Sequence, residues 1–467
     1  MPRTRLCLWL LWSVACRAPS APPARPATTS APTATATIAA RPSPERAPAG
    51  PRPWIEDDYA RALETAKKDR LPLLVDASAV WCHTCRAMRA FVLDDASLPG
   101  GFVRLSFDVE KEQNAAAAAA FPTHVLPTFF VVDPADGAIH GRWEGAGSVP
   151  QMRAFMRDAA RSIQLAHTNE LAPDDPLALL LAGHRAALAG DARKSADAFS
   201  RALAKAPAGW EHAPEALLGL LKAQRHTGGP CAESAVAALT ESPSRLGDTS
   251  VMADFASEAL DCVEASKDAA AVKVRQLVAS EVARVARDAS APLSPDDRAD
   301  AWKVVWDARE ALGDHAGALE AARARLDVIE KAVAARPEPE WTTTFDGARM
   351  ETLEFLGRGE DAASFLSAQE KALPDDYDPP HRLAHVYFKL KRYPEALAAV
   401  ERALAKGYGA RKGLMYRLEA DILVAMGRRA DARAALEKQL ALYRSLPESQ
   451  KKPGYEKAVQ EQIDKLK

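Results

Sequence analysis

Two cysteines three positions apart follow an apolar run and precede a run that suits a helix. Residues 81–85 are Trp-Cys-His-Thr-Cys, the apolar run covers residues 73–77, and the helix-compatible run covers residues 86–91. A helix N-terminus carries unsatisfied N–H groups and partial positive charge, so a thiol placed there loses its proton more readily. A thiolate with a second thiol within reach supports disulfide exchange. The spacing therefore predicts a strand, a turn and a helix that present Cys82 and Cys85 as a redox pair.

The same cysteines could instead supply half of a zinc site. A structural zinc needs four ligands, typically from two CxxC or Cys/His pairs. The chain has no second CxxC, and His83 lies between the two cysteines, where chelation beside both sulfurs is awkward. We therefore expect redox chemistry at Cys82 and Cys85, and we expect neither a metal site nor another cofactor.

Further residues around the pair fit a known pattern. An aspartate lies inside the apolar run, and a Leu-Pro-Thr sequence at residues 126–128 opens another apolar run at residues 129–132. Residues 54–163 resemble a thioredoxin-fold domain, and within that superfamily they are most similar to the C-terminal domain of bacterial DsbD-type thiol-disulfide interchange proteins. The residues that carry this resemblance are Asp76, Trp81, Cys82, Cys85, Pro127 and Gly145.

The resemblance implies a role for each of these positions. Cys82 would attack a disulfide, Cys85 would resolve the mixed disulfide, and Asp76 would be a buried acid that manages the proton of Cys85. The peptide between Leu126 and Pro127 would be cis and would lie against the cysteine pair. The residues alone leave alternatives open, because Asp76 could be a surface acid and Pro127 an ordinary trans proline that begins a strand.

The residues beside the cysteines are expected to tune the pair. A protonated His83 would stabilise the Cys82 thiolate and make the disulfide more oxidising, and Thr84 completes the intervening pair. The Gly-Pro pair common in thioredoxins is absent, so the direction of electron flow stays open. Trp81 fits packing as well as chemistry, and a loop histidine such as His124 is more often solvated than catalytic.

Hydrophobic periodicity predicts the elements of a thioredoxin-like domain over residues 53–165. The expected elements are a helix at 55–70, a strand at 71–77, a helix at 82–93, a strand at 102–109, a helix at 110–120, two strands at 128–133 and 138–144 around a hairpin signal, and a closing helix at 149–163.

The N-terminus predicts export. Residues 1–5 are basic, and the apolar run at residues 6–15 is too short to span a bilayer, which needs about 20 residues. Residues 1–16 are therefore expected to be a signal peptide, with Cys16 a candidate for lipidation in the manner of bacterial lipoproteins, although Ser13 departs from that signal. Ordinary cleavage a few residues later and an uncleaved anchor are the alternatives. All three place the body of the protein in the periplasm or outside the cytoplasm, with membrane contact only through the anchor.

The next segment, residues 17–52, consists almost entirely of Ala, Pro, Thr, Ser and Arg. Such a sequence has almost no large apolar side chains to bury, so it cannot offset the entropy lost on ordering. We expect a disordered linker that tethers the redox domain and lets it search for partners near the membrane.

Two further cysteines, Cys231 and Cys262, lie in the C-terminal part. In an oxidising compartment they are candidates for a structural disulfide. Two buried free cysteines in a helical core are the alternative.

Residues 171–467 are predicted to form helices with a period near 34 residues, which is typical of tetratricopeptide repeats. The pattern fades between residues 210 and 337. Such arrays leave an extended concave surface, so a protein partner is expected there. The clearest small and large repeat positions are Gly183, Ala186, Phe199, Ala202, Leu383, Ala384, Ala396, Val400, Ala420, Leu423, Ala432 and Leu436.

The sequence as a whole predicts an α/β thioredoxin fold followed by an all-α tetratricopeptide-like solenoid. The net charge is −2 and no long basic block occurs, so nothing suggests nucleic-acid binding. The expected function is extracytoplasmic thiol-disulfide exchange with client proteins, and the resemblance adds a membrane protein that conducts reductant. A scaffold or assembly protein whose redox domain is secondary is the alternative.

Overall fold

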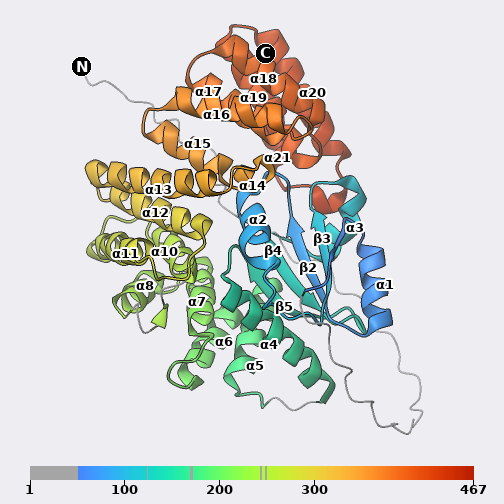
Figure 1. The fold of residues 1–467 in the computed structure, drawn as a ribbon, viewed down its shortest axis with the longest axis vertical. Helices are drawn as coiled ribbons and strands as arrows, with labels where there is room; N and C mark the ends of the chain where they lie inside the picture. The colour runs from blue at the N-terminus through green and yellow to red at the C-terminus, as the bar shows by residue number, and fades with distance from the viewer. Residues whose placement is uncertain (1–50, 124, 169–171, 242–244, 248–249, 467) are drawn as a thin grey trace. The chain divides into compact units, whose positions relative to one another are not determined.

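Residues 54–144 form a five-stranded mixed sheet with helices on both faces (Figure 1). The strands are β1 (Trp54–Glu56), β2 (Leu73–Ser78), β3 (Val103–Asp108), β4 (Thr128–Val132) and β5 (Ile139–Glu144). Their order is β1-β3-β2-β4-β5, with β2 parallel to β3 and antiparallel to β4. The central strand β2 is buried on both faces, which explains why its sequence is a nearly continuous apolar run.

The computed structural model describes residues 51–466 apart from residues 124, 169–171, 242–244 and 248–249. The predicted signal peptide, Cys16, His124 and all but the last two residues of the predicted linker therefore lie outside the described residues. The described residues fall within one compact unit, Ala47–Lys467.

The two faces of the sheet bury different side chains because alternate residues of a strand point in opposite directions. Leu73 and Val75 pack with α1 and α3 on one face, whereas Leu74 packs with α2 and α4 on the other. The helices of this part are α1 (Tyr59–Asp69), α2 (His83–Met88), α3 (Ala115–Ala120) and α4 (Val149–Thr168), with a π-helical turn η1 (Arg89–Leu93) after α2 and a 3₁₀ turn η2 (Glu112–Asn114) before α3.

The predicted order of elements is confirmed, with one error at the start and one in the helix expected at residues 110–120, where a 3₁₀ turn at Glu112–Asn114 precedes a helix that begins only at Ala115. The helix predicted from residue 55 begins only at Tyr59, because residues 54–56 form the edge strand β1 beside β3. Asp57, between β1 and α1, has a positive φ of 53°. The Asp58 side chain accepts a hydrogen bond from the Arg61 N–H and so caps α1.

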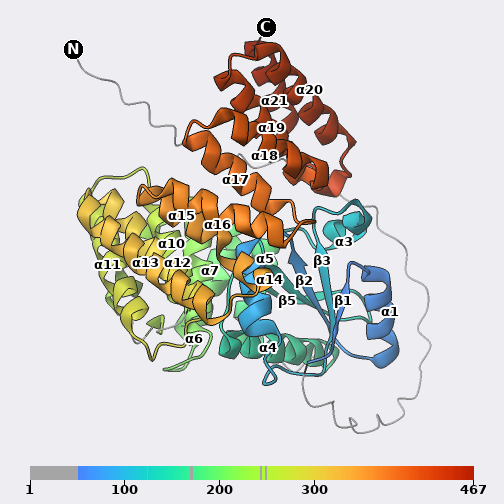
Figure 2. The ribbon, with the colours of Figure 1, turned by 45° about the horizontal axis from the view of Figure 1, so that its top comes forward.

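The remaining described residues form helices that pack as consecutive antiparallel pairs, which is the tetratricopeptide-like arrangement (Figures 1 and 2). These helices are α5 (Pro176–Leu188), α6 (Ala192–Lys205), α7 (Ala213–Thr227), α8 (Cys231–Thr240), α10 (Ser250–Cys262), α11 (Ala269–Arg287), α12 (Pro295–Ala311), α13 (His315–Ala335), α14 (Pro339–Thr342), α15 (Asp346–Phe355), α16 (Gly359–Ala372), α17 (Asp378–Lys389), α18 (Tyr393–Lys406), α19 (Gly409–Ala425), α20 (Arg429–Ser445) and α21 (Tyr455–Lys465), with 3₁₀ turns η3 (Thr343–Phe345) and η4 (Glu448–Gln450).

Small residues let the paired helices approach closely. The ring of Phe199 in α6 lies over Gly183 in α5 and Gly219 in α7, so that a Cβ atom added at these glycines would stand 2.7 Å and 2.6 Å from the ring. The repeat pattern of the sequence fades between residues 210 and 337, but the helices there keep the same pairing, because they bury a large shared core of valine, alanine and tryptophan.

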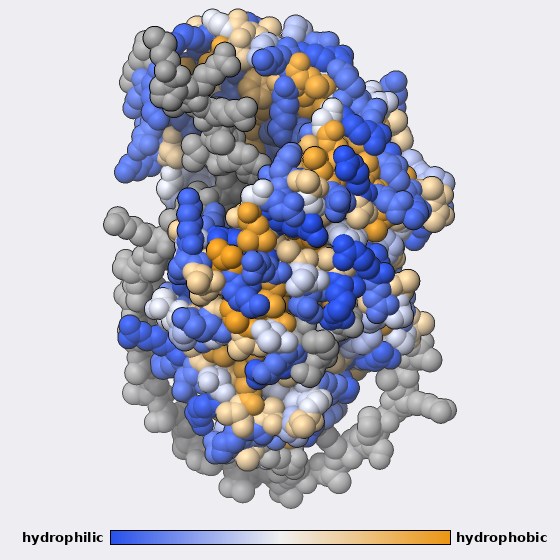
Figure 3. All heavy atoms as spheres, turned by 90° about the vertical axis from the view of Figure 1, so that its left-hand side faces the viewer, coloured by the Kyte–Doolittle hydropathy of each residue, from blue (hydrophilic) through white to orange (hydrophobic). Residues whose placement is uncertain are grey.

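On the side drawn in Figure 3, apolar residues lie in small groups among hydrophilic ones. Among the described residues, the large hydrophobic side chains that are exposed are Val125, Leu414, Val424 and Tyr455. None of the helices in the described ranges has the length and apolar character needed to cross a bilayer.

Candidate active site

The cysteine pair lies where β2 leads into α2. Cys82 and Cys85 form a disulfide with an S–S distance of 2.02 Å and a Cα–Cα distance of 5.2 Å. Cys82 is the N-cap residue of α2, and its Sγ accepts a hydrogen bond of 3.0 Å from the Cys85 N–H. Such a donor favours the thiolate form of Cys82 once the disulfide is reduced. Each cysteine is only 4 % exposed.

Asp76 is buried inside β2, in the strand that leads to the pair. Its Oδ2 accepts hydrogen bonds from Ser106 Oγ at 3.1 Å and Arg89 Nε at 3.3 Å. Its Oδ1 has no hydrogen-bond partner within the described part of the chain. Burial raises the pKa of Asp76 above its ordinary value, and Arg89 and Ser106 only partly oppose this. The carboxyl group is therefore suited to exchange a proton.

The loop before β4 lies beside the sulfurs. The Leu126–Pro127 peptide is cis, and Leu126 packs against the cluster formed by Ala79, Cys82 and Cys85. The Pro127 carbonyl accepts a hydrogen bond of 2.9 Å from Gly145 N–H. Gly145 has a φ of +83°, a conformation that favours glycine.

Trp81, directly before the pair, joins the redox end of the domain to the helical repeats. Its indole N–H donates to Glu110 Oε1 at 3.1 Å, and its carbonyl accepts from Arg382 of α17 at 3.2 Å. The Arg411 guanidinium of α19 lies 4.6 Å from the centre of the indole ring. The position of Trp81 is therefore fixed by groups from both parts of the chain.

Glu110 forms the second half of this contact. Its Oε2 accepts a hydrogen bond of 2.6 Å from the Arg411 backbone N–H. Burial raises the pKa of Glu110 to about 7, although the hydrogen bonds from Arg411 and Trp81 oppose the shift. The loop after β3 is thus held against the start of α19.

Arg86, the residue after Cys85, makes the most direct link. Its Nε donates to the Val80 carbonyl at 2.7 Å, its Nη2 donates to Asp376 at 2.8 Å, and its Nη1 donates to the Thr343 hydroxyl. One guanidinium therefore holds the turn before the cysteines and two segments of the repeats. Figures 1 and 2 both show α2 beside α14, close to these segments.

His83, the first residue of α2, faces acidic side chains of α12. Its Nε2 lies 3.8 Å from Asp300 Oδ2 and 3.3 Å from the Thr84 hydroxyl. Burial lowers the pKa of His83, but Asp300 and Asp296 outweigh it and leave the pKa raised. The repeats thus supply the charges around the residue that separates the cysteines.

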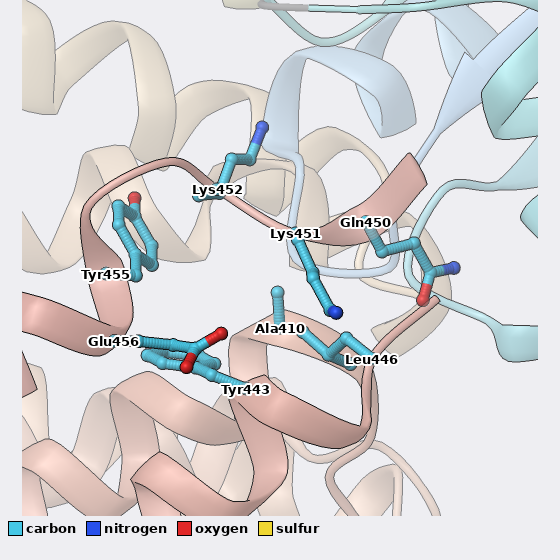
Figure 4. A pocket seen from close by; sticks show the side chains of 8 residues that line it. All are labelled: Ala410, Tyr443, Leu446, Gln450, Lys451, Lys452, Tyr455 and Glu456. Atoms are coloured by element: carbon cyan, nitrogen blue, oxygen red, sulfur yellow. The ribbon is translucent and has the colours of Figure 1, made fainter. Parts of the chain in front are cut away.

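A further contact with the repeats covers the loop that follows β3. The Tyr408 hydroxyl donates to Asp108 at 2.6 Å, and the Gln450 amide donates to the carbonyls of Val109 and Lys111 at 3.0 and 2.9 Å. Gln450 also lines a small pocket with Tyr443 and neighbouring residues (Figure 4). That pocket has room for about one water molecule and is lined by no cysteine.

Cys231 and Cys262 form a second disulfide, with a Cα–Cα distance of 6.1 Å. It joins the first residue of α8 to the last residue of α10, inside the large core of the repeats. These sulfurs belong to a helical core and lack the strand–turn–helix setting of the redox pair.

Sequence reasoning missed the partners that the repeats supply. Arg86 lies in the motif itself, yet nothing in its spacing points to Asp376 or Thr343. Arg382 and Arg411 lie on repeat helices and follow no pattern that distinguishes them from other surface arginines. Near the motif, the sequence offers only acidic and aromatic residues such as Asp76 and Trp81 as signals, and these do not identify the partners in the repeats.

Comparison with known proteins supports the two-part organisation. A family model described as thioredoxin-like matches residues 54–134, which include both redox cysteines. No curated protein matches the chain.

Solved structures resemble the helical part. A tetratricopeptide repeat protein from Parabacteroides merdae is 17% identical, with a TM-score of 0.39 over 62% of this chain and 98% of its own. BtubC from P. vanneervenii is 15% identical, with a TM-score of 0.34 over 50% and 94%. A thermophilic tetratricopeptide repeat protein from Thermus thermophilus is 15% identical, with a TM-score of 0.22 over 62% and 98%. These scores add nothing to what the helix pairing itself establishes.

Proposed function

We propose that this protein is an extracytoplasmic thiol-disulfide oxidoreductase that exchanges disulfides with client proteins through Cys82 and Cys85. The observation that carries the proposal is the Cys82–Cys85 disulfide at the N-terminus of α2, with the Cys82 sulfur accepting the Cys85 N–H. The cis Leu126–Pro127 peptide beside the pair and the buried Asp76 support it. The predicted signal peptide supports the compartment.

The reduced pair would act in two steps. The Cys82 thiolate attacks one client sulfur, which breaks the client disulfide, forms a mixed disulfide and releases the other client sulfur as a thiolate that takes up a proton. Cys85 then loses its proton and attacks the Cys82 sulfur, which re-forms the Cys82–Cys85 bond and releases the second client thiol. The client gains two electrons and two protons, and the pair becomes oxidised.

Asp76 accepts the proton of Cys85 in this scheme. Its raised pKa and its unpartnered Oδ1 suit that task, because a buried carboxylate oxygen without a donor gains from taking up a proton. The reverse reaction uses the same groups and oxidises client thiols. The reductant would come from a membrane protein that conducts electrons, as the family resemblance implies.

Access to the pair is restricted by the repeats, which we propose select the client. Trp81 and Arg86 are both bonded to repeat residues, and the cysteines are almost fully buried. Val125, next to the cis peptide, is 44 % exposed. A client segment would reach the sulfurs from this side while its other parts contact the repeats.

The reduction potential of the pair tests the proposal. The purified protein is equilibrated in graded thiol buffers, and alkylated cysteines are counted by mass. A reversible two-electron transition at about −270 mV identifies a reductant, and one at about −120 mV identifies a disulfide donor. Cys82→Ser is expected to abolish turnover, whereas Cys85→Ser is expected to accumulate mixed disulfides. The proposal fails if the pair shows no transition or if Cys82→Ser reduces a test disulfide at the normal rate.

A scaffold function is the second candidate, and the contacts between the two parts favour it. The repeats bind Trp81, Arg86 and Glu110, so the redox domain serves equally as a docked structural element. Cells that carry Cys82→Ser with Cys85→Ser separate the two functions. Normal function in those cells, together with loss of function on deleting residues 171–467, indicates a scaffold.

A further inference from the structure

Three potential metal ligands from distant parts of the sequence converge beside the redox disulfide. They are His83 from the start of α2 and Asp296 and Asp300 from the first turns of α12, and one ligand atom of each lies within 4.8 Å of the others. Asp296 and Asp300 share a face of α12 because they are four residues apart. His83 Nε2 and Asp300 Oδ2 are 3.8 Å apart, which is too long for a hydrogen bond.

The buried state of Asp296 points to a ligand. Asp296 is 1 % exposed, and its Oδ1 has no hydrogen-bond partner in the ranges that the structure describes. A buried carboxylate oxygen without a partner is costly, and cations are one of the groups that relieve this cost. Its neighbour Asp297 differs, because it completes a capping box with Ser294. The Asp297 carboxylate accepts the Ser294 N–H, and the Asp297 N–H donates to the Ser294 hydroxyl.

The surrounding cations are shared with acids outside the three ligands, and Arg382, which acts on His83, binds Asp378. Arg325 lies 3.5 Å from Asp300 Oδ1, but its Nη1 donates to Glu351 at 2.7 Å. Lys303 likewise binds Asp307 at 2.6 Å. Asp297 lies close enough to Asp296 to raise its pKa, and Asp300 likewise raises the pKa of the buried Asp254, so the acids of this region repel one another. The field around the three ligands therefore favours a cation.

We propose that His83, Asp296 and Asp300 form a binding site for a divalent transition-metal ion such as Zn²⁺. One imidazole nitrogen and two carboxylate oxygens are ligand types that Zn²⁺ accepts, and water would complete the coordination. Bonds of about 2.0–2.2 Å place neighbouring ligand atoms on one zinc roughly 3.4 Å apart. Small side-chain rotations bring the three atoms from their present separation to that spacing.

The site would couple metal binding to the redox pair. The ion would hold the residue between the cysteines against α12 and so fix the turn that presents Cys82. It would also place positive charge beside the helix N-terminus, where a thiolate forms on reduction. This coupling rests on the proposed redox function, whereas metal binding itself is tested on the oxidised protein and does not depend on it.

Metal titration of the oxidised full-length protein tests this inference. In that state the Cys82 and Cys85 sulfurs are bonded to each other and supply no thiolate ligand. Calorimetric titration with Zn²⁺ is expected to give one site, and both Asp296→Asn and His83→Gln are expected to weaken it at least about tenfold. Glu310→Gln near the end of the same helix, where the side chain pairs with His315, is the matched control and should leave the affinity unchanged.

Absorption of the Co²⁺-loaded protein identifies the ligands. Nitrogen and oxygen ligation gives visible d–d bands without thiolate-to-cobalt charge transfer, and this is the expected spectrum. Binding that appears only after reduction, with charge-transfer bands, would place the ion on the cysteines and overturn the inference. Unchanged affinity in Asp296→Asn and His83→Gln, or no binding to the oxidised protein, would overturn it as well. Because His83 is only partly buried, His83→Gln decides the question should Asp296→Asn fail to fold.

Discussion

Arg86 Nη2 lies 2.8 Å from Asp376 Oδ2, in the loop between α16 and α17. The side chains are 22 % and 13 % exposed, so water screens the pair only partly. Arg86 Nε also binds the Val80 carbonyl in the turn before Cys82. Arg86 therefore ties the redox turn to the repeats, beside the contacts that Arg382 and Arg411 make with Trp81.

Arg86→Ala is expected to destabilise the protein by roughly 1–3 kcal/mol, because it removes the Arg86 donor from Asp376 Oδ2 and from the Val80 carbonyl. Chemical denaturation measures this free energy of unfolding. Arg433→Ala is the control, because its i,i+4 pair with Glu437 is exposed on both sides and is worth at most a few tenths of a kcal/mol. Equal effects of the two substitutions would show that Arg86 does not hold the two parts together.

Asp76→Asn is expected to slow the release of the mixed disulfide without preventing its formation. The carboxyl group with a raised pKa is replaced by an amide that cannot accept the proton of Cys85. Quenched-flow detection of the mixed disulfide over a range of pH measures both steps. The dependence of release on the ionisation of Asp76 should disappear in the variant. A normal release rate at every pH would assign the proton to another group.

Gly183→Ala is expected to destabilise the repeats by about 1–3 kcal/mol, because the added methyl group overlaps the ring of Phe199. The intrinsic helix propensity of alanine would by itself favour the substitution by about 1 kcal/mol. Gly101→Ala, in the loop before β3, is the control for a glycine-to-alanine change without a clash, since an added Cβ there meets no atom within 4 Å. Thermal unfolding compares the two variants, and a more stable Gly183→Ala protein would contradict the tight packing of α5 on α6.

The sequence predicted the local elements of the redox domain well, for a physical reason. A central strand buried on both faces is largely apolar, so the run at residues 73–77 predicts a strand despite the aspartate at position 76. The edge strand β1 has only three residues, which is too short for a periodic signal. The apolar face of α1 therefore seemed to begin earlier than it does, although the capping residue Asp58 marked the true start.

The candidate site was predictable only where it is local. The cysteine pair, Asp76 and the cis proline lie within one domain and follow a recognisable spacing. The partners Asp376, Arg382 and Asp300 come from the repeats, and their approach to α2 depends on how the helix pairs stack. No period or motif encodes that approach, because each contact joins two residues that are far apart in the sequence.

A buried ion-pair network predicts a pH dependence of stability. His212 before α7 binds Asp158 of α4 at 2.7 Å and Glu215 at 3.2 Å. Burial opposes the imidazolium, but these hydrogen bonds raise the pKa of His212 to about 9. Burial also disfavours the Glu215 carboxylate, but hydrogen bonds with His184 and His212 lower its pKa to about 2.

The direction in which pH changes the stability follows from whether the folded or the unfolded chain holds each proton more tightly. Folded His212 binds its proton more tightly than the unfolded chain, so its contribution is full below about pH 6.5 and is lost as the pH rises through about 9. Glu215 contributes above about pH 4.5, and this part is lost as the pH falls toward 2. Unfolding measured across this range should show both declines. His212→Gln should flatten the alkaline one, and an unchanged alkaline decline would exclude the network as its source.

Removing the second disulfide is expected to affect stability and leave the redox pair unchanged. The Cys231–Cys262 bond joins α8 to α10 and closes a loop with a sequence separation of 31, so Cys231→Ala with Cys262→Ala should cost about 2–4 kcal/mol. The bond lies in the core of the repeats, whereas the Cys82–Cys85 pair lies at the start of α2. The reduction potential of that pair should therefore stay the same in the double variant.

The effect of a reductant on the unfolding temperature distinguishes the two disulfides in a second way. In a Cys82→Ser, Cys85→Ser background only the Cys231–Cys262 bond remains within the described residues, so any fall in the unfolding temperature on adding reductant reports that bond alone. A fall equal to that of the double alanine variant identifies a structural disulfide. No response to reductant, with two alkylatable thiols after denaturation of the untreated protein, would mean that Cys231 and Cys262 are free cysteines that simply pack in the helical core.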